Sequence, residues 1–168
     1  DMGDRERDID KQRKEPGKVI TVYSYKGGVG RSMAMANIAV VLREWGDKTL
    51  IIDWDLEDAG LEKFYKDYVD MEEIVQKKGI IDLHNLNNSK SGVDVTTIDW
   101  DNYISVININ NIPLYFLSAG KRDDNYISNV RQFDYGSFYS EFDGGQFIEN
   151  IRDHWRTGFD FILIDSRT

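Results

Sequence analysis

The 168-residue sequence contains no cysteine. This absence excludes disulfide bonds, thiolate zinc sites and cysteine-held iron–sulfur clusters, and with them an iron–sulfur reductase. No apolar run approaches the roughly 20 residues that a membrane-spanning helix needs, and the first residues lack the apolar segment of a secretory signal. We therefore expect a cytoplasmic protein without a membrane span.

An excess of positive charge is also missing, because 30 acidic residues face 21 lysines and arginines and give a formal net charge of −9. This balance argues against broad, sequence-independent binding to nucleic acids. Histidine is scarce as well, and neither His84 nor His154 has a second nitrogen ligand at metal-binding spacing. We expect both histidines to be surface or helix-capping groups rather than catalytic ones.

Hydrophobic residues make up 40% of the chain and charged residues 30%, which is typical of an ordinary globular protein. Residues 1–17 are mixed in charge, almost free of large apolar side chains, and end in Pro16-Gly17. We interpret them as a linker or tail. The remaining residues, 18–168, have the length of one domain with a sizeable core.

From Lys18 onward, short apolar runs alternate with helical patterns. Strands are expected at 18–24, 49–53, 113–119 and 159–166, with helices at 32–45 and 146–156. Residues 87–112 predict a long excursion with one irregular strand near 104–109. The alternation predicts an α/β fold with a mostly parallel sheet and helices on both faces, whose ligand lies beyond the carboxyl ends of the strands.

The first polar segment at such a strand end is SYKGGVGRS, residues 24–32. Its three glycines allow positive φ, so that backbone N–H groups can turn inward around an anion. The helix that follows adds further N–H donors and the positive end of its dipole. Ser32 offers a hydroxyl suited to Mg²⁺, and Arg31 a fixed positive charge. The segment predicts a phosphate-binding loop, against the alternative of a glycine-rich turn without a ligand.

Aspartates occupy two further strand ends. Asp53 and Asp55 lie two residues apart, so one can position Mg²⁺ through water while the other orients or activates an attacking water. Asp165 follows four apolar residues, as does the second Mg²⁺-directing carboxylate, known as Walker B. The candidate metal ligands are therefore Ser32, Asp53 and Asp165, against the alternatives of a solvated acidic loop and an aspartate that caps a turn.

Four motifs together resemble the deviant Walker A ATPases, the MinD/ParA/CobQ-type group of the SIMIBI class of P-loop proteins. The motifs are KGGVGRS (26–32), DWD (53–55), LYFLSAG (114–120) and FDFILIDSRT (159–168). Their combination with an arginine in the loop, and with LSAGKRDD (117–124), is similar to a bacterial branch found in multidomain signalling or defence proteins. Tyr25 and Arg31 then look like features of this branch rather than signs of decay.

The resemblance implies ATP and Mg²⁺ as ligands and a homodimer that sandwiches the nucleotides. It places Lys26 on the phosphates of the partner subunit and gives Asp55 the attacking water, so these two are the catalytic candidates. It assigns nucleotide binding to Lys26, Gly27, Gly28, Val29, Gly30, Arg31, Ser32 and Met33. The family pattern continues beyond Thr168, so we expect a C-terminally incomplete domain of a larger protein, with an exposed sheet edge.

Two functions stay open. The first is a Mg²⁺-dependent ATPase that works as a dimerising switch, and the second is a nucleotide-binding module for regulation or oligomerisation that does not hydrolyse. Arg31 favours the second, because its planar, bidentate contact with phosphate differs from that of the usual lysine. The aromatic residues at 133–142 are expected to pack rather than to stack on bases, because basic residues are not interleaved among them.

Overall fold

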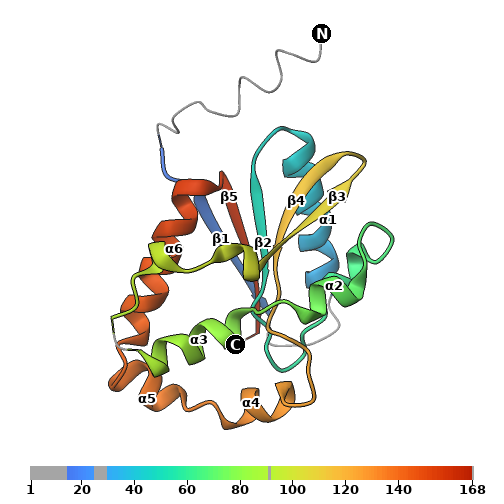
Figure 1. Ribbon diagram of the computed structural model, residues 1–168. Helices are drawn as coiled ribbons and strands as arrows, with labels where there is room; N and C mark the ends of the chain where they lie inside the picture. Colours follow the sequence, from blue (N-terminus) through green and yellow to red (C-terminus); the bar gives the residue numbers. More distant parts are fainter. Residues whose placement is uncertain (1–14, 25–29, 91, 168) are drawn as a thin grey trace.

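The computed structural model of the chain describes residues 15–24, 30–90 and 92–167. Most of the predicted tail therefore lies outside the described residues, as do loop residues 25–29. The described chain forms one five-stranded sheet in the order β1-β5-β2-β4-β3 (Figure 1). The strands are β1 (Lys18–Ser24), β2 (Thr49–Asp53), β3 (Ile104–Ile109), β4 (Ile112–Leu117) and β5 (Phe161–Arg167).

Four of these strands run parallel, which confirms the predicted α/β architecture with its mostly parallel sheet. The exception is β3, which pairs antiparallel with β4. Asn110 and Asn111 join the two strands with φ angles of 51° and 67°. Such a two-residue turn matches the twist of a hairpin, and asparagine tolerates this left-handed conformation better than most residues.

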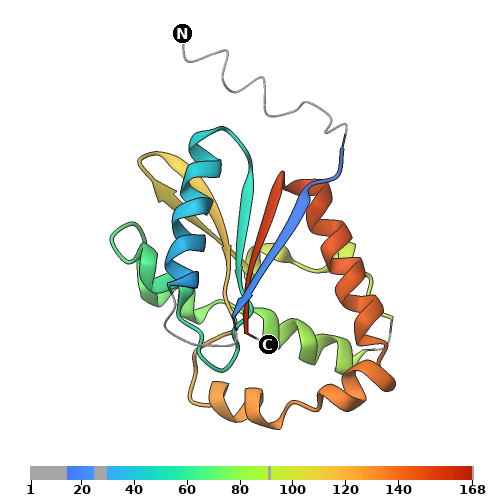
Figure 2. The ribbon, with the colours of Figure 1, turned by 180° about the vertical axis from the view of Figure 1, so that it is seen from behind.

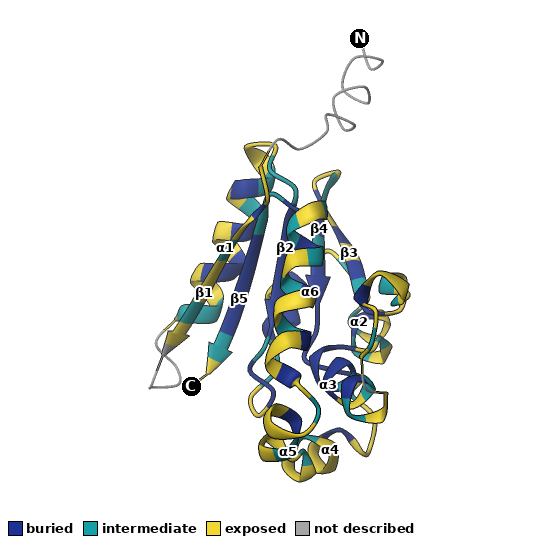
Figure 3. Ribbon diagram, turned by 90° about the vertical axis from the view of Figure 1, so that its left-hand side faces the viewer, coloured by how far each residue is buried: buried dark blue, intermediate teal, exposed yellow. Residues whose placement is uncertain are grey.

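The expected helices at 32–45 and 146–156 are confirmed as α1 (Arg31–Glu44) and α6 (Gly144–Gly158). Shorter elements fill the connections between the strands: η1 (Leu61–Tyr65), α2 (Met71–Gln76), α3 (Ile80–Ser89), η2 (Val95–Thr97), η3 (Trp100–Asn102), α4 (Tyr126–Gln132) and α5 (Tyr135–Ser140), where η denotes a 3₁₀ helix. Helices α3, α4 and α5 lie at the end of the sheet where β1, β2 and β5 finish (Figure 3).

An apolar core lies on each face of the sheet, between the strands and the helices, because successive strand residues point to opposite faces. On one face, α1 packs Met35 and Ala39 against Ile51 of β2 and Leu163 of β5. The other core lies under α6, with Phe147, Ile151 and Trp155 beside Leu50, Ile52, Ile162 and Ile164. Both helices flank the sheet in Figure 2. The layers hold the carboxyl ends of β2 and β5 side by side, at the start of α1.

Strand β1 forms an edge of the sheet and pairs only with β5 among the described residues. Ile20 and Tyr23 on this strand are 42% and 61% exposed. Val41 on the neighbouring helix α1 is also exposed, as is Trp45, which follows the last residue of that helix. β1 is therefore one edge of the sheet, and β3 is the other (Figure 3). Within the described chain, no helix is long and apolar enough to cross a membrane.

The expectation for His84 is wrong, because this side chain is only 2% exposed. Its ring lies 4.8 Å from Phe138 and 5.3 Å from Phe133, centroid to centroid. Burial lowers the pKa of His84 to about 4, since a charged imidazolium is poorly solvated there. The aromatic residues near 133–142 thus pack around a histidine. His154 is half-buried and stacks on Trp100.

Candidate functional site

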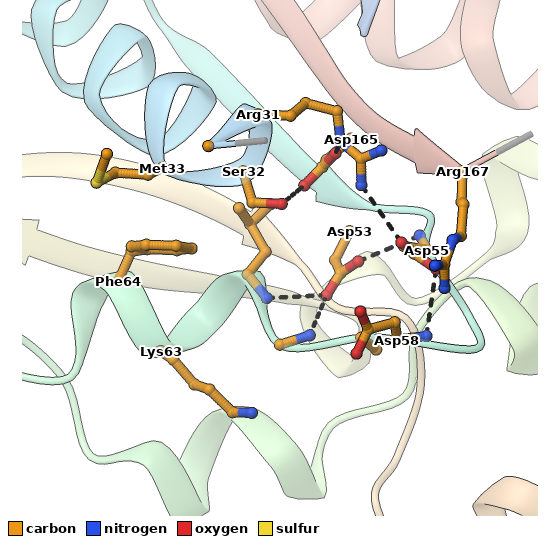
Figure 4. Close-up of a pocket in the computed structure, with 14 residues that line it drawn as sticks. Arg31, Ser32, Met33, Asp53, Asp55, Asp58, Lys63, Phe64, Asp165 and Arg167 are labelled. Carbon is orange, nitrogen blue, oxygen red and sulfur yellow. Dashed lines mark hydrogen bonds and ion pairs between the residues drawn. The ribbon is translucent and has the colours of Figure 1, made fainter. Parts of the chain in front are cut away.

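A pocket of ≈ 430 Å³ lies where α1 begins and where β2 and β5 end. This is the position that parallel sheets offer to ligands, beyond the carboxyl ends of their strands. Its described lining is polar and charged on one side and includes Arg31, Ser32, Asp53, Asp55, Asp58 and Asp165 (Figure 4). The three segments that the sequence singled out therefore meet in one pocket.

Helix α1 presents its N-terminus to this pocket. Gly30 precedes the helix with φ of 77°, a left-handed conformation that glycine adopts without strain. Neither a capping side chain nor an acidic residue occupies this first turn. The positive end of the helix dipole is thus directed at the pocket without a carboxylate of its own helix to neutralise it, as anion binding requires.

Arg31, the first residue of α1, directs its guanidinium at two carboxylates. Nη2 lies 3.3 Å from Oδ2 of Asp55, and Nε pairs with Oδ1 of Asp165 (Figure 4). The Arg31 side chain is 12% exposed. The planar guanidinium is suited to such a double contact, because its N–H groups diverge in a fixed fork. Arg31 thus lies between the candidate phosphate site at the start of α1 and the candidate metal ligand Asp165.

Ser32 and Asp165, two of the three candidate metal ligands, lie in contact. The Ser32 hydroxyl donates a hydrogen bond of 2.5 Å to Oδ2 of Asp165. Register explains the position of Asp165, since β5 pairs with both β1 and β2 and brings Asp165 level with Asp53. The pairing of β5 therefore places Asp165, the Walker B candidate, beside Ser32, although 133 residues separate the two in sequence.

Asp53, the third candidate ligand, is held by backbone N–H groups. Its Oδ2 accepts hydrogen bonds from Gly60 (2.8 Å) and Leu61 (3.1 Å), and its Oδ1 accepts one from Asp55 (3.2 Å). Burial raises the pKa of Asp53 to about 6, and the bonds from Gly60 and Leu61 offset part of that rise. Asp53 therefore shapes the loop between β2 and η1 and lines the pocket at the same time.

Asp55 is 6% exposed and sits in the same loop. Its Oδ1 accepts the N–H of Asp58 at 3.2 Å, while its Oδ2 faces Arg31. The two oxygens are thus fixed by different partners, one from the loop and one from α1. A carboxylate fixed at the rim of a pocket in this way is placed where it can orient a water molecule.

Two lining residues, Lys63 and Phe64 of η1, were not anticipated from the sequence. Arg167, at the end of β5, lies within the motif at 159–168. Figure 4 shows Met33, Lys63 and Phe64 on one side of the pocket, away from Arg167. The only sequence signal for Lys63 and Phe64 is that they lie close to the aspartate motif at 53–55. Four expected binding residues, Lys26, Gly27, Gly28 and Val29, lie outside the described residues.

The oxygen atoms of the pocket suit a hard cation. Ser32 and Asp165 offer a hydroxyl and a carboxylate, which Mg²⁺ accepts together with water and phosphate oxygens. Among the described residues, no group of three or more histidine, aspartate or glutamate side chains could hold a metal by itself. A magnesium ion at this position would therefore depend on ligands from a bound phosphate, as it commonly does in nucleotide sites.

The fold is shared with solved structures of a MinD protein and of a plasmid partition protein. The septum site-determining protein MinD from Pyrococcus horikoshii, solved with Mg-ADP, is 24% identical with a TM-score of 0.58, and the match covers 89% of this chain and 48% of that one. A putative plasmid partition protein from Borrelia burgdorferi, bound to AMPPNP, is 22% identical with a TM-score of 0.60, and the match covers 91% and 54%.

The kinase domain of the Escherichia coli tyrosine kinase ETK shares the fold at 15% identity with a TM-score of 0.53, covering 92% of this chain and 48% of that domain. The chain thus spans about half the length of these solved structures. No curated protein matches the sequence. A family model described as an AAA domain matches residues 17–167, and the chain belongs to this family.

Proposed function

We propose that the chain binds ATP with Mg²⁺ in the pocket at the start of α1 and hydrolyses it. One observation carries this proposal: the N-terminus of α1 and the carboxylates of Asp55 and Asp165 converge on a single pocket of ≈ 430 Å³. A triphosphate needs an anion cradle and a cation site within a few ångströms, and the pocket offers both. The nucleotides held by the MinD and plasmid partition structures support the choice of ligand.

Each described residue has a definite part in this proposal. Arg31 and the N–H groups at the start of α1 bind phosphate, and Met33 lines the same wall. Ser32 and Asp165 would hold Mg²⁺, with Asp53 behind them. The metal would supply charge neutralisation at the phosphates. Asp55 orients the attacking water, since its carboxylate faces the pocket from a fixed loop.

Several parts of the proposal rest on the resemblance in sequence. The loop KGGVGRS belongs to the deviant Walker A type, and Lys26 reaches the phosphates of a second copy in a nucleotide-sandwich homodimer. Residues 18–168 form the nucleotide-binding domain, or part of it, in a larger cytoplasmic protein. These statements fit a chain that spans about half the length of the solved structures it matches.

The test is a titration of labelled ATP and GTP, with and without Mg²⁺, on the wild-type chain and on Asp55→Ala. Asp55→Ala should abolish phosphate release, measured in a parallel assay, without weakening ATP binding, because the carboxylate contacts the reacting water and competes with phosphate for Arg31. Asp153→Ala, an exposed aspartate on α6, is the matched control. Failure of the wild-type chain to bind either nucleotide above background would overturn the proposal.

A second function is favoured by the contact between Arg31 and Asp55. An arginine that pairs with the candidate water-orienting carboxylate occupies one of its oxygens, which is then not free to orient a water molecule. The chain would then hold nucleotide without turning it over, as a regulatory or oligomerisation module. Tight ATP binding with no phosphate release in the wild-type chain would identify this second function, whereas release that depends on Asp55 would exclude it.

A further inference from the structure

The loop that carries Asp55 is anchored at its far end by a buried charge pair. Glu62, on η1, is only 2% exposed, and its Oε1 lies 3.5 Å from Nη2 of Arg122. Its other oxygen, Oε2, has no hydrogen-bond partner among the described residues. A carboxylate buried in this way needs a nearby cation, so the position of η1 depends on Arg122.

Arg122 also contacts the start of the segment between Asp55 and Glu62, through Tyr126. The guanidinium lies over the Tyr126 ring at 4.7 Å from its centroid, and the Tyr126 hydroxyl donates a 2.8 Å hydrogen bond to the carbonyl oxygen of Leu56. Leu56 directly follows Asp55. A single arginine is thus connected to both ends of the segment between Asp55 and Glu62.

The backbone of residues 120–122, which carries the Arg122 side chain, is itself held by close contacts. Its backbone N–H donates a 2.7 Å hydrogen bond to the carbonyl oxygen of Val75, which ties it to α2. Two residues earlier, a Cβ added to Gly120 would lie 2.4 Å from Ile81 and 3.0 Å from Tyr126. Glycine is therefore required for this close approach, and the turn after β4 offers Arg122 a rigid support.

The charge of Arg122 acts on the site as well. Asp53 and Glu62 are two buried carboxylates in one short segment, and both are within the electrostatic reach of Arg122. Backbone N–H groups of Gly60 and Leu61 connect η1 directly to Asp53. A displacement of η1 would therefore move the partners of Asp53, and through the Asp53 carboxylate the backbone of Asp55.

We propose that Arg122 is a positioning residue of the nucleotide site: it fixes both ends of the segment 55–62, and so holds Asp55 in place over the pocket. The role in catalysis rests on the function proposed above, whereas the role in fixing the segment does not. Arg122 lines no part of the pocket described above and acts only through Glu62 and Tyr126.

The first experiment measures amide hydrogen exchange in wild type, Arg122→Met and Arg122→Lys by mass spectrometry. Arg122→Met should speed exchange in peptides covering 54–61 by about tenfold, because local opening there becomes easier, and leave peptides from β5 unchanged. Arg122→Lys keeps the charge and should restore part of the protection. If Arg122→Met does not fold, Glu62→Gln removes the same pair and should give the same pattern.

Arg43→Met is the matched control, since Arg43 is also half-buried and its guanidinium donates hydrogen bonds to the carbonyl oxygens of Pro113 and Asp47, near the opposite end of the sheet. It should lower overall stability without speeding exchange at 54–61. Unchanged exchange at 54–61 in Arg122→Met would overturn the proposal.

The second experiment separates positioning from general destabilisation by steady-state kinetics. In Arg122→Met, ATP turnover should fall about tenfold while KM stays within about twofold, because the phosphate contacts of α1 are untouched. Faster exchange at 54–61 without any loss of turnover would reduce Arg122 to a structural residue and overturn its role at the site. Absence of turnover in the wild-type chain would contradict the proposed hydrolysis and leave the exchange result standing.

Discussion

The guanidinium of Arg31 lies between two carboxylates, with Nη2 at 3.3 Å from Asp55 and Nε paired with Asp165. A phosphate group that enters the pocket must compete with both carboxylates for this cation. A lysine ammonium at the same position would offer one compact charge rather than a planar fork. The arginine therefore couples phosphate binding to the charges of the residues proposed to direct metal and water.

Loss of Arg31 should destabilise the fold, because it leaves buried carboxylates without a counter-charge. Arg31→Met should lower the free energy of unfolding by about 3 kcal/mol, and Arg31→Lys by less. Urea denaturation measures both. Arg152→Met, which breaks an exposed pair with Glu149, should change stability by less than about 0.5 kcal/mol. Equal stability of Arg31→Met and wild type would contradict the pairing.

Ser32→Ala tests the metal site. The change removes the hydroxyl that donates to Asp165 and that we propose as a Mg²⁺ ligand. ATP affinity should fall by about tenfold in Mg²⁺ and change little in the presence of a chelator, because only the metal-dependent part of binding is lost. Isothermal titration calorimetry gives both values. Ser105→Ala, a buried serine on β3, serves as the control, and an equal loss with and without Mg²⁺ would speak against a metal ligand.

The buried carboxyl of Asp53 makes stability depend on pH. Its pKa in the folded chain is raised from 3.8 to about 6, so its stabilising contribution is full below about pH 3.8 and is lost as the pH rises through 6. Between about pH 4 and about pH 7, the wild type should lose about 2 kcal/mol of stability relative to Asp53→Asn. A pH-independent difference between the two would show that the pKa is not raised.

Asp94 provides a control of opposite sign. Hydrogen bonds from the side chain and backbone of Thr96 lower the pKa of this exposed aspartate. Its contribution is therefore present at neutral pH and is lost as the pH falls. Relative to Asp94→Asn, the wild type should lose stability on acidification, whereas relative to Asp53→Asn it should gain.

The buried ring of His84 should make the protein less stable at acidic pH. Burial lowers its pKa from 6.5 to about 4, so the stability of the neutral ring is full above about pH 6.5 and is lost as the pH falls toward 4. His84→Phe places an uncharged ring of similar size beside Phe133 and Phe138. It should gain about 2 kcal/mol over wild type between about pH 7.5 and about pH 5, measured by urea unfolding. Parallel pH profiles would contradict the burial of a neutral histidine.

Much of the fold was accessible from the sequence, because buried parallel strands and a long amphipathic helix have strong local signals. The strands at 18–24, 49–53 and 104–109 agree with the structure at both ends. The antiparallel direction of β3 was not predicted, although Asn110-Asn111 carries the asparagine signal of a hairpin turn. Helices α2 to α5 were missed because none is longer than ten residues and their patterns are short.

The site was predictable only as far as strand ends determine it. Asp53, Asp55 and Asp165 could be placed together because parallel strands finish at one edge of a sheet. The partners of these side chains could not be predicted. Which carboxylates pair with the Arg31 guanidinium depends on distances in the folded chain, and no local sequence pattern encodes them. His84 was misassigned for a similar reason, because the aromatic rings that bury it come from separate segments.

The hydrogen bond between Ser32 and Asp165 spans 133 residues and has a consequence for synthesis on the ribosome. The serine and its loop are made early, but the carboxylate that completes the pocket arrives only with β5. Contacts of such long sequence separation form late, after most of the chain entropy has been lost. A nascent chain that ends before β5 therefore lacks this half of the proposed metal site, so the ability to retain Mg²⁺ and nucleotide appears only once β5 has emerged.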